Sequence, residues 1–149
     1  MLGQRGAERM VEVLHATSVA LGEAGLLILG PAGSGKSSLA LGLMAYGATL
    51  VSDDRTELRR PDDGPPVMTA PPAIRGLIEA RHIGLLAAET RAAARLVLCI
   101  DLGTVERDRL PQRRTIRLLD SAVPLIHKPA SGDAAPALVQ YLKASRWCP

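Results

Sequence analysis

Residues 25–37 read GLLILGPAGSGKS, a short apolar run followed directly by a loop rich in glycine and serine. The apolar part, residues 25–29, is typical of a strand that is buried on both faces of a sheet. The loop, residues 30–37, matches G-x-x-x-x-G-K-[ST] at every fixed position. Helical spacing follows over residues 37–46, and Gly47 offers a C-terminal stop. The stretch therefore predicts a strand, a phosphate-binding loop and a helix in succession.

The fixed positions of this loop have separate tasks in binding a nucleoside triphosphate such as ATP. Glycines permit backbone angles that turn several N–H groups inward, where they and the positive end of the helix hold phosphate oxygens. Lys36 supplies a point charge for the terminal phosphates, and the Ser37 hydroxyl is suited to ligating Mg²⁺. The expected nucleotide-binding residues are Gly30, Pro31, Ala32, Gly33, Ser34, Gly35, Lys36, Ser37 and Ser38.

The segments on both sides of the loop indicate an α/β fold with a mixed sheet and flanking helices. Strands are expected at residues 11–16, 18–21, 49–52, 56–60, 95–102, 114–119 and 123–127. A second helix is expected over residues 133–145, with Asp133 as its N-cap.

Three segments are less regular. Residues 61–72 contain five prolines and predict a loop. Residues 87–94 suggest a helical turn or two, and residues 74–86 fit either strand or helix. Residues 1–10 are expected to be a flexible start, and residues 11–149 a single domain.

Composition restricts the classes of function. The 149 residues contain one Trp, two Tyr and no Phe, too few rings for a stacking platform that binds single-stranded nucleic acid. The two cysteines form no CxxC or Cys/His spacing, so a zinc site is not expected. Without a long apolar segment at the N-terminus or elsewhere, the sequence predicts a cytoplasmic protein that acts apart from membranes.

An acidic pair, Asp53-Asp54, ends the strand expected at residues 49–52. If that strand lies beside residues 25–29, both following loops open at the same edge of the sheet, where α/β proteins bind ligands. One carboxylate can then hold Mg²⁺ while the other accepts a proton from a hydroxyl group. A polar turn without chemistry explains the same pair equally well.

Three further residues are candidates only in combination. His15 lies fifteen residues before Gly30, and a lone histidine in a strand is more often structural. Glu79 and Arg81 alternate with apolar residues and face the same side if their segment is a strand. A solvated salt pair is the simpler interpretation of Glu79 and Arg81.

Taken together, these segments resemble the C-terminal catalytic domain of HPr kinase/phosphorylase. That family has a histidine fifteen residues before the loop, where His15 stands here. Its loop reads G-x-S-G-x-G-K-S, which matches except at Ala32, and its next strand ends in A-D-D, matched by Asp53 and Asp54. Its signature E-I-R-G-L-G-I-I looks like residues 79–86, EARHIGLL, with a histidine in place of the first glycine.

The resemblance implies a fold like that of phosphoenolpyruvate carboxykinase and a ring-shaped homo-oligomer, usually a hexamer. It implies an ATP- and Mg²⁺-dependent kinase that phosphorylates a serine of an HPr-like phosphocarrier protein of the phosphotransferase system. The regulatory N-terminal domain and the later basic segment of the long forms have no clear match, so the chain resembles the short form. Kinase activity is then the firmer expectation, and reverse phosphorolysis the weaker one.

The resemblance also suggests roles for individual residues. Asp53 is expected to take the serine proton, while Asp54 supports the metal or orients Asp53. His15 is expected to favour the ionised carboxylate of this pair. Glu79 is expected to be a second carboxylate on the metal side, and Arg81 to bind phosphate or hold Glu79. A small-metabolite kinase and a non-catalytic ATP-binding regulatory module remain as alternatives.

Overall fold

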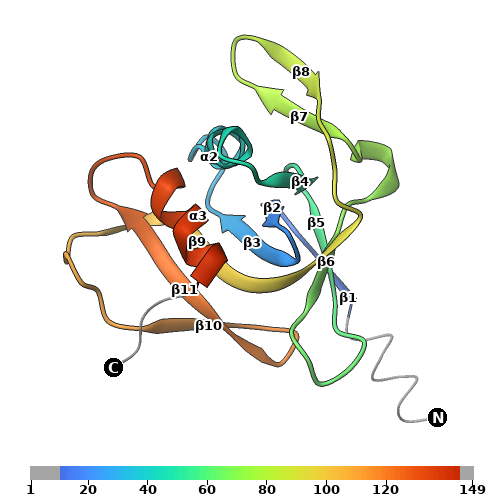
Figure 1. Ribbon diagram of the computed structural model, residues 1–149. Coiled ribbons are helices and arrows are strands. Elements are labelled where there is room, and N and C mark those ends of the chain that lie inside the picture. Colours follow the sequence, from blue (N-terminus) through green and yellow to red (C-terminus); the bar gives the residue numbers. More distant parts are fainter. Residues whose placement is uncertain (1–10, 145–149) are drawn as a thin grey trace.

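The computed structural model describes residues 11–144, which form a nine-stranded mixed sheet, a separate two-stranded hairpin and two α-helices (Figure 1). The expected flexible start at residues 1–10 and the last residue of the helix expected at 133–145 lie outside the described residues. The strands are β1 (Val11–Leu14), β2 (Thr17–Leu21), β3 (Ala24–Leu29), β4 (Thr49–Ser52), β5 (Thr56–Arg59), β6 (Val67–Thr69), β7 (Leu77–Ala80), β8 (Gly84–Ala87), β9 (Ala93–Glu106), β10 (Arg114–Leu118) and β11 (Ser121–Pro129). The helices are α2 (Lys36–Ala45), α3 (Ala135–Ala144) and the short 3₁₀ helix η1 (Pro72–Ile74).

The long strand β9 is the centre of the sheet. Strand order runs β1-β5-β6-β9-β3-β2-β4, and the β10–β11 pair joins through β11 and β9. β9 pairs in parallel with β3 and β11 and antiparallel with β6. The predicted mixed sheet with flanking helices is therefore confirmed.

The sheet separates two apolar clusters because side chains alternate along each strand. From β3, Leu26 and Ile28 face the cluster that contains α2 and α3, while Leu27 faces the cluster on the opposite side. Leu43 of α2 and Leu138 of α3 are buried in the helix-side cluster. The opposite cluster is built from strand residues, because β5, β6, β10 and β11 cover that face.

Two expectations about the irregular segments are wrong. The loop expected at residues 61–72 contains β6, which bridges β5 and β9 with Met68 fully buried. The helical turns expected at residues 87–94 are extended backbone instead. The Arg91 amide donates to the Leu50 carbonyl at 2.9 Å, so pairing with β4 replaces helical hydrogen bonds.

The ambiguous residues 74–86 form the β7–β8 hairpin, which projects from the rest of the fold beyond α2 (Figure 1). Within residues 11–144, no helix is both long and apolar enough to span a bilayer.

The strands β3, β4, β9 and β11 all run in one direction, because β2 is antiparallel to both β3 and β4. β4 is therefore separated from β3 by β2 and does not lie directly beside it. The loops that follow these four strands still open at one edge of the sheet, which is where the candidate site lies.

Candidate active site

The loop between β3 and α2 has the backbone conformation expected of a phosphate cradle. Gly30, Gly33 and Gly35 have φ angles of 148°, 81° and 98°, values that side chains other than glycine rarely adopt. A Cβ at Gly35 would meet no atom within 4 Å, and one at Gly33 would meet only the Arg81 guanidinium at 3.9 Å. The backbone here borders open space beside the start of α2, where N–H groups and the helix dipole favour an anion.

Two polar side chains of the loop, Lys36 and Ser34, are placed where they could bind a phosphate. The Lys36 ammonium curls back and donates to the carbonyls of Gly30 at 2.7 Å and Pro31 at 3.2 Å. The Ser34 hydroxyl is buried and has no hydrogen-bond partner among the described residues. Since a buried hydroxyl and an ammonium without a carboxylate are both favourable places for an anion, the loop fits a triphosphate.

Asp53 is the hub of the hydrogen bonds at this edge of the sheet, and only 8% of the residue is exposed. Its Oδ1 accepts from the hydroxyls of Ser37 at 2.6 Å and Thr17 at 3.0 Å. Its Oδ2 accepts from the backbone amide of Glu79 at 3.0 Å. Both carboxylate oxygens thus accept hydrogen bonds, and they tie the loop, β2 and the hairpin together.

Asp54 has the opposite character. Its side chain is 60% exposed and lies 3.1 Å from Nδ1 of His15, which is also 2.9 Å from the Asp54 carbonyl. The Asp54 backbone has a φ of 68°, a left-handed conformation that is uncommon outside glycine and often found at functional sites. This conformation turns two adjacent carboxylates into different surroundings, one buried and one open.

The sequence predicts Asp53 as the base, while the structure leaves the Asp54 carboxylate the more exposed of the two. Asp53 is buried, and three of the roughly four lone-pair sites of its carboxylate already accept hydrogen bonds, so little of it is open to an acceptor hydroxyl. Asp54, in contrast, borders the cavity beside the loop and is contacted by His15. Asp54 is thus the carboxylate that is open to the cavity, and Asp53 is the one that holds the Ser37 hydroxyl.

A cavity of about 240 Å³ gathers most of the remaining site residues beside the loop. Glu79 and Arg81, one at the end of β7 and one in the hairpin turn, both border it, as expected if their segment is a strand. Thr17 also borders the cavity, donates to Asp53 and accepts from the Asp54 amide at 3.2 Å. Nothing in the sequence distinguished Thr17 from any other strand threonine.

The donor set near Ser37 suits Mg²⁺ bound together with a nucleotide. Oxygen atoms from Ser37, Asp53 and Glu79 are hard ligands, which Mg²⁺ prefers. No group of three His, Cys, Asp or Glu side chains is placed to hold a metal in the part of the chain that the structure describes. Mg²⁺ bound with a nucleotide keeps several waters and takes phosphate oxygens in addition to one or two protein ligands, so Ser37 and a nearby carboxylate would suffice to hold it.

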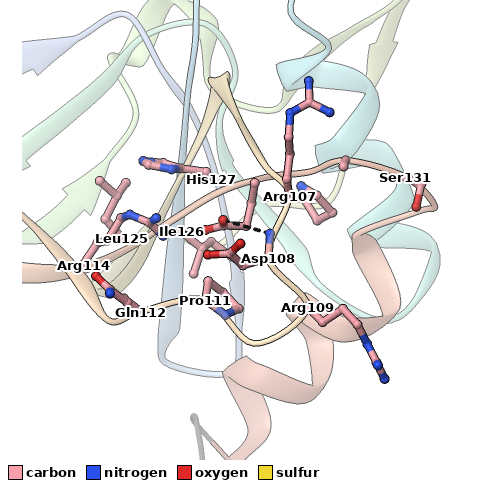
Figure 2. Close-up of a pocket in the computed structure, with 13 residues that line it drawn as sticks. Arg107, Asp108, Arg109, Pro111, Gln112, Arg114, Leu125, Ile126, His127 and Ser131 are labelled. Carbon is pink, nitrogen blue, oxygen red and sulfur yellow. Dashed lines mark hydrogen bonds and ion pairs between the residues drawn. The ribbon is translucent and has the colours of Figure 1, made fainter.

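Another cavity, of about 330 Å³, lies elsewhere, between the β9–β10 connection and the end of β11 (Figure 2). Figure 2 shows Arg107 and Arg109 pointing away from each other, so their charges do not converge on one ligand. Partial burial raises the pKa of Glu106, but hydrogen bonds from Arg114 and the Asp108 amide outweigh burial and lower it overall. The ion pair between Glu106 and Arg114 is a structural feature of this connection, and we assign no chemistry to the cavity.

The sequence of the chain is similar to those of known HPr kinases. Residues 8–132 match the family model described as the HPr serine kinase C-terminal domain. The chain is 34% identical over 128 residues to an HPr kinase/phosphorylase from an Exiguobacterium species and 33% identical to one from Bacillus licheniformis. Each alignment covers 78% of this chain, which spans only 41% of the length of these curated relatives.

A solved structure shares the fold. The structure of the Hpr(Ser) kinase/phosphatase from Coxiella burnetii superposes with a TM-score of 0.72 at 26% identity, covering 89% of this chain and 88% of that one. The sequence and structural similarities agree with each other, and the chain belongs to the HPr serine kinase C-terminal domain family.

Proposed function

We propose that the chain is an ATP- and Mg²⁺-dependent kinase that transfers a phosphoryl group to a serine hydroxyl of an HPr-like phosphocarrier protein. The observation that carries this proposal is the open carboxylate of Asp54, contacted by His15, at the cavity beside the phosphate loop. A base in that position is what distinguishes a transferase site from a loop that only binds nucleotide. The names of the relatives support the same reaction and acceptor.

In this proposal, Lys36, Arg81 and the loop amides hold the phosphates and stabilise their charge during transfer. Lys36 reaches the ligand by leaving the carbonyls of Gly30 and Pro31, which are its present partners. Arg81 is suited to the terminal phosphate because its guanidinium lies 3.9 Å from the Cβ position of Gly33.

Mg²⁺, when bound, would neutralise negative charge on the phosphates during transfer. Ser37 is the proposed direct ligand, and Asp53 orients its hydroxyl through the 2.6 Å hydrogen bond. Glu79 is the proposed carboxylate on the metal side, acting through water. The buried position of Asp53 keeps this arrangement fixed before the nucleotide arrives.

Asp54 accepts the proton of the serine hydroxyl while the hydroxyl oxygen forms a bond to the γ-phosphorus of ATP. The bond from the γ-phosphorus to the oxygen that links it to the β-phosphate breaks, and ADP leaves. His15 positions the Asp54 carboxylate by its contact of 3.1 Å. The open surroundings of Asp54 allow an acceptor side chain to approach it directly.

Beside the cavity, the β7–β8 hairpin favours a protein acceptor over a small metabolite. Ile83 and Leu85 on this hairpin are 78% and 66% exposed, and Leu86 is 38% exposed. Apolar side chains exposed together next to a catalytic cavity are typical of a surface that contacts another protein. We extend the proposal to self-association into the family's ring, which a mass measurement in solution would test.

The test mixes the chain with ATP, Mg²⁺ and an HPr-type protein and follows phosphoserine formation by intact mass. We expect Asp54→Asn to lower the transfer rate by about 10²- to 10⁴-fold while ATP binding is retained. Asp62→Asn, a carboxylate in the exposed loop after β5, is the matched control. Normal turnover by Asp54→Asn refutes the base assignment.

The same assay separates the alternatives. Transfer to a metabolite but to no carrier protein would identify a small-molecule kinase. ATP binding without turnover on any acceptor would identify a regulatory module. Added inorganic phosphate and phosphorylated carrier test the reverse reaction.

A further inference from the structure

We propose that a second cavity, on the opposite flank of the phosphate loop from Asp54, holds the base and ribose of the nucleotide. The inference rests on the proposed function, since it assumes that the loop binds a nucleoside triphosphate. The cavity has a volume of about 220 Å³. Its inner wall is formed by Ser34 and Gly35 of the loop and by Leu39 in the first turn of α2.

Sheet order sets the direction in which a triphosphate must run. The acidic pair follows β4, which lies on the β2 side of β3. The second cavity is bordered by Leu102 of β9 and by Lys128 and Pro129 of β11, on the other side of β3. Since the γ-phosphate must face Asp54 for transfer, the α-phosphate and the nucleoside extend toward β9 and β11.

The two cavities meet at the start of α2. Gly35 borders both, and the next three residues, 36–38, border the cavity of Asp54. Leu39 is four positions after Gly35, so the two residues share a helix face, and both border the second cavity. A triphosphate lying across the Gly35 amide therefore has one end in each cavity.

The chemistry of the walls suits a nucleoside rather than another phosphate. Leu39, Leu102, Pro129 and Ala134 offer apolar surface for the flat faces of a base and a sugar. The end of β9 is packed close to the loop, because a Cβ at Gly30 would lie 3.2 Å from Leu102 Cβ.

The polar groups at the rim are Lys128 and Asp133. Lys128 is exposed and borders the cavity, so its aliphatic stem is available as a wall while its ammonium stays in solvent. Asp133 uses Oδ1 to accept from the Ala135 amide at 3.0 Å, but the Ala134 carbonyl accepts the first hydrogen bond of α3, so the N-cap is Ala134 and the prediction of Asp133 is one residue early. The other carboxylate oxygen of Asp133 is the candidate acceptor for a ribose hydroxyl or a base amine.

Two probes, titrated by calorimetry in the presence of Mg²⁺, separate the nucleoside from the phosphates. ATP fills both cavities, whereas inorganic tripolyphosphate engages only the loop and the cavity of Asp54. In Ala134→Trp the indole occupies the second cavity. We expect ATP to bind at least about tenfold more weakly, a loss of about 1.4 kcal/mol, with tripolyphosphate affinity within about twofold of the unsubstituted chain.

Ala137→Trp places the same side chain on the exposed face of α3 and is the matched control, with unchanged binding of both probes. Lys128→Ala changes an exposed residue, so folding is preserved even if Ala134→Trp fails to fold. We expect Lys128→Ala to weaken ATP by about threefold and to leave tripolyphosphate unchanged.

Unchanged ATP affinity in both cavity variants would overturn the inference, as would an equal loss for both probes. The proposed function fails in a different way, because an unsubstituted chain that binds neither probe refutes the loop itself. Lys36→Ala should lose both probes together.

Discussion

Replacement of Asp53 and Asp54 by alanine, one at a time, should affect stability in very unequal ways. Asp53→Ala removes the acceptor of three hydrogen bonds, from Thr17, Ser37 and the Glu79 amide. Hydrogen bonds to a charged group contribute about 1.5–3 kcal/mol each. The lower end applies here, because all three donors border a cavity that water enters.

The expected cost of Asp53→Ala is smaller than three such bonds. Relieving the desolvation of a buried carboxylate offsets part of the loss, which leaves about 2–3 kcal/mol. Asp54→Ala removes only an exposed contact with His15, where both side chains are more than half exposed. Exposed ion pairs contribute about 0–1 kcal/mol, so Asp54→Ala should be nearly neutral.

Urea unfolding followed by circular dichroism, without nucleotide or Mg²⁺, measures both costs. The midpoint should fall clearly for Asp53→Ala with an unchanged slope, and hardly move for Asp54→Ala. Equal destabilisation by the two substitutions would refute the assignment of a buried hub and an open base. So would a free energy of unfolding for Asp53→Ala within about 0.5 kcal/mol of the unsubstituted chain.

Three further predictions concern residues away from the reaction. Arg60 ties the loop after β5 to the β10–β11 turn, because its side chain donates to the carbonyls of Asp63, Gly64, Leu119 and Asp120. Arg60→Ala should therefore lower the free energy of unfolding, measured in urea, by about 2 kcal/mol. Phosphoryl transfer should stay normal. Burial raises the pKa of Cys99 to about 12, so its thiol is protonated at pH 8 and unreactive. In a Cys148→Ser background, an aromatic disulfide reagent at pH 8 should therefore react with Cys99 only after unfolding. Rapid reaction in the folded state would contradict this. The pKa of Glu106 is lower in the folded state than in the unfolded state, so its ionised carboxylate stabilises the fold above the unfolded-state pKa, and this stabilisation is lost as pH falls through the folded-state pKa. Arg114→Ala should therefore make the free energy of unfolding fall less steeply below about pH 4.3. An unchanged dependence of unfolding free energy on acid pH would contradict this.

Local pattern was sufficient to predict the phosphate loop and its neighbours. The strand at residues 25–29, the glycines and the following helix are adjacent in sequence, so each restricts the next. The strand expected at residues 49–52 matches the observed bounds of β4. The expected helices also match α2 and α3 to within a residue or two at each end that the structure describes.

What the sequence missed depends on partners that lie far along the chain. β6 has three residues and exists because β5 and β9 pair with it from either side. The extended backbone before β9 is fixed by Leu50, some forty positions earlier. Neither signal is present in the local composition of a segment rich in proline or alanine.

The different surroundings of Asp53 and Asp54 were also beyond local pattern. Adjacent residues in a regular strand would face opposite sides, but the left-handed backbone at Asp54 and the three donors around Asp53 decide their surroundings. Likewise, the second cavity is lined by residues from three separate stretches of the chain, so no contiguous motif marks it.

The long strand β9 links the two halves of the molecule mechanically. Leu98 and Ile100 contribute to the helix-side cluster, while Leu96 and Cys99 contribute to the opposite one. If β9 leaves the sheet, its buried side chains are lost from both clusters, so neither cluster can unfold independently of the other. Amide hydrogens of residues 96–100 should therefore exchange with deuterium only through global unfolding. A ligand that binds the folded loop raises the free energy of global unfolding by mass action, so it should slow the exchange of these amides by the corresponding factor.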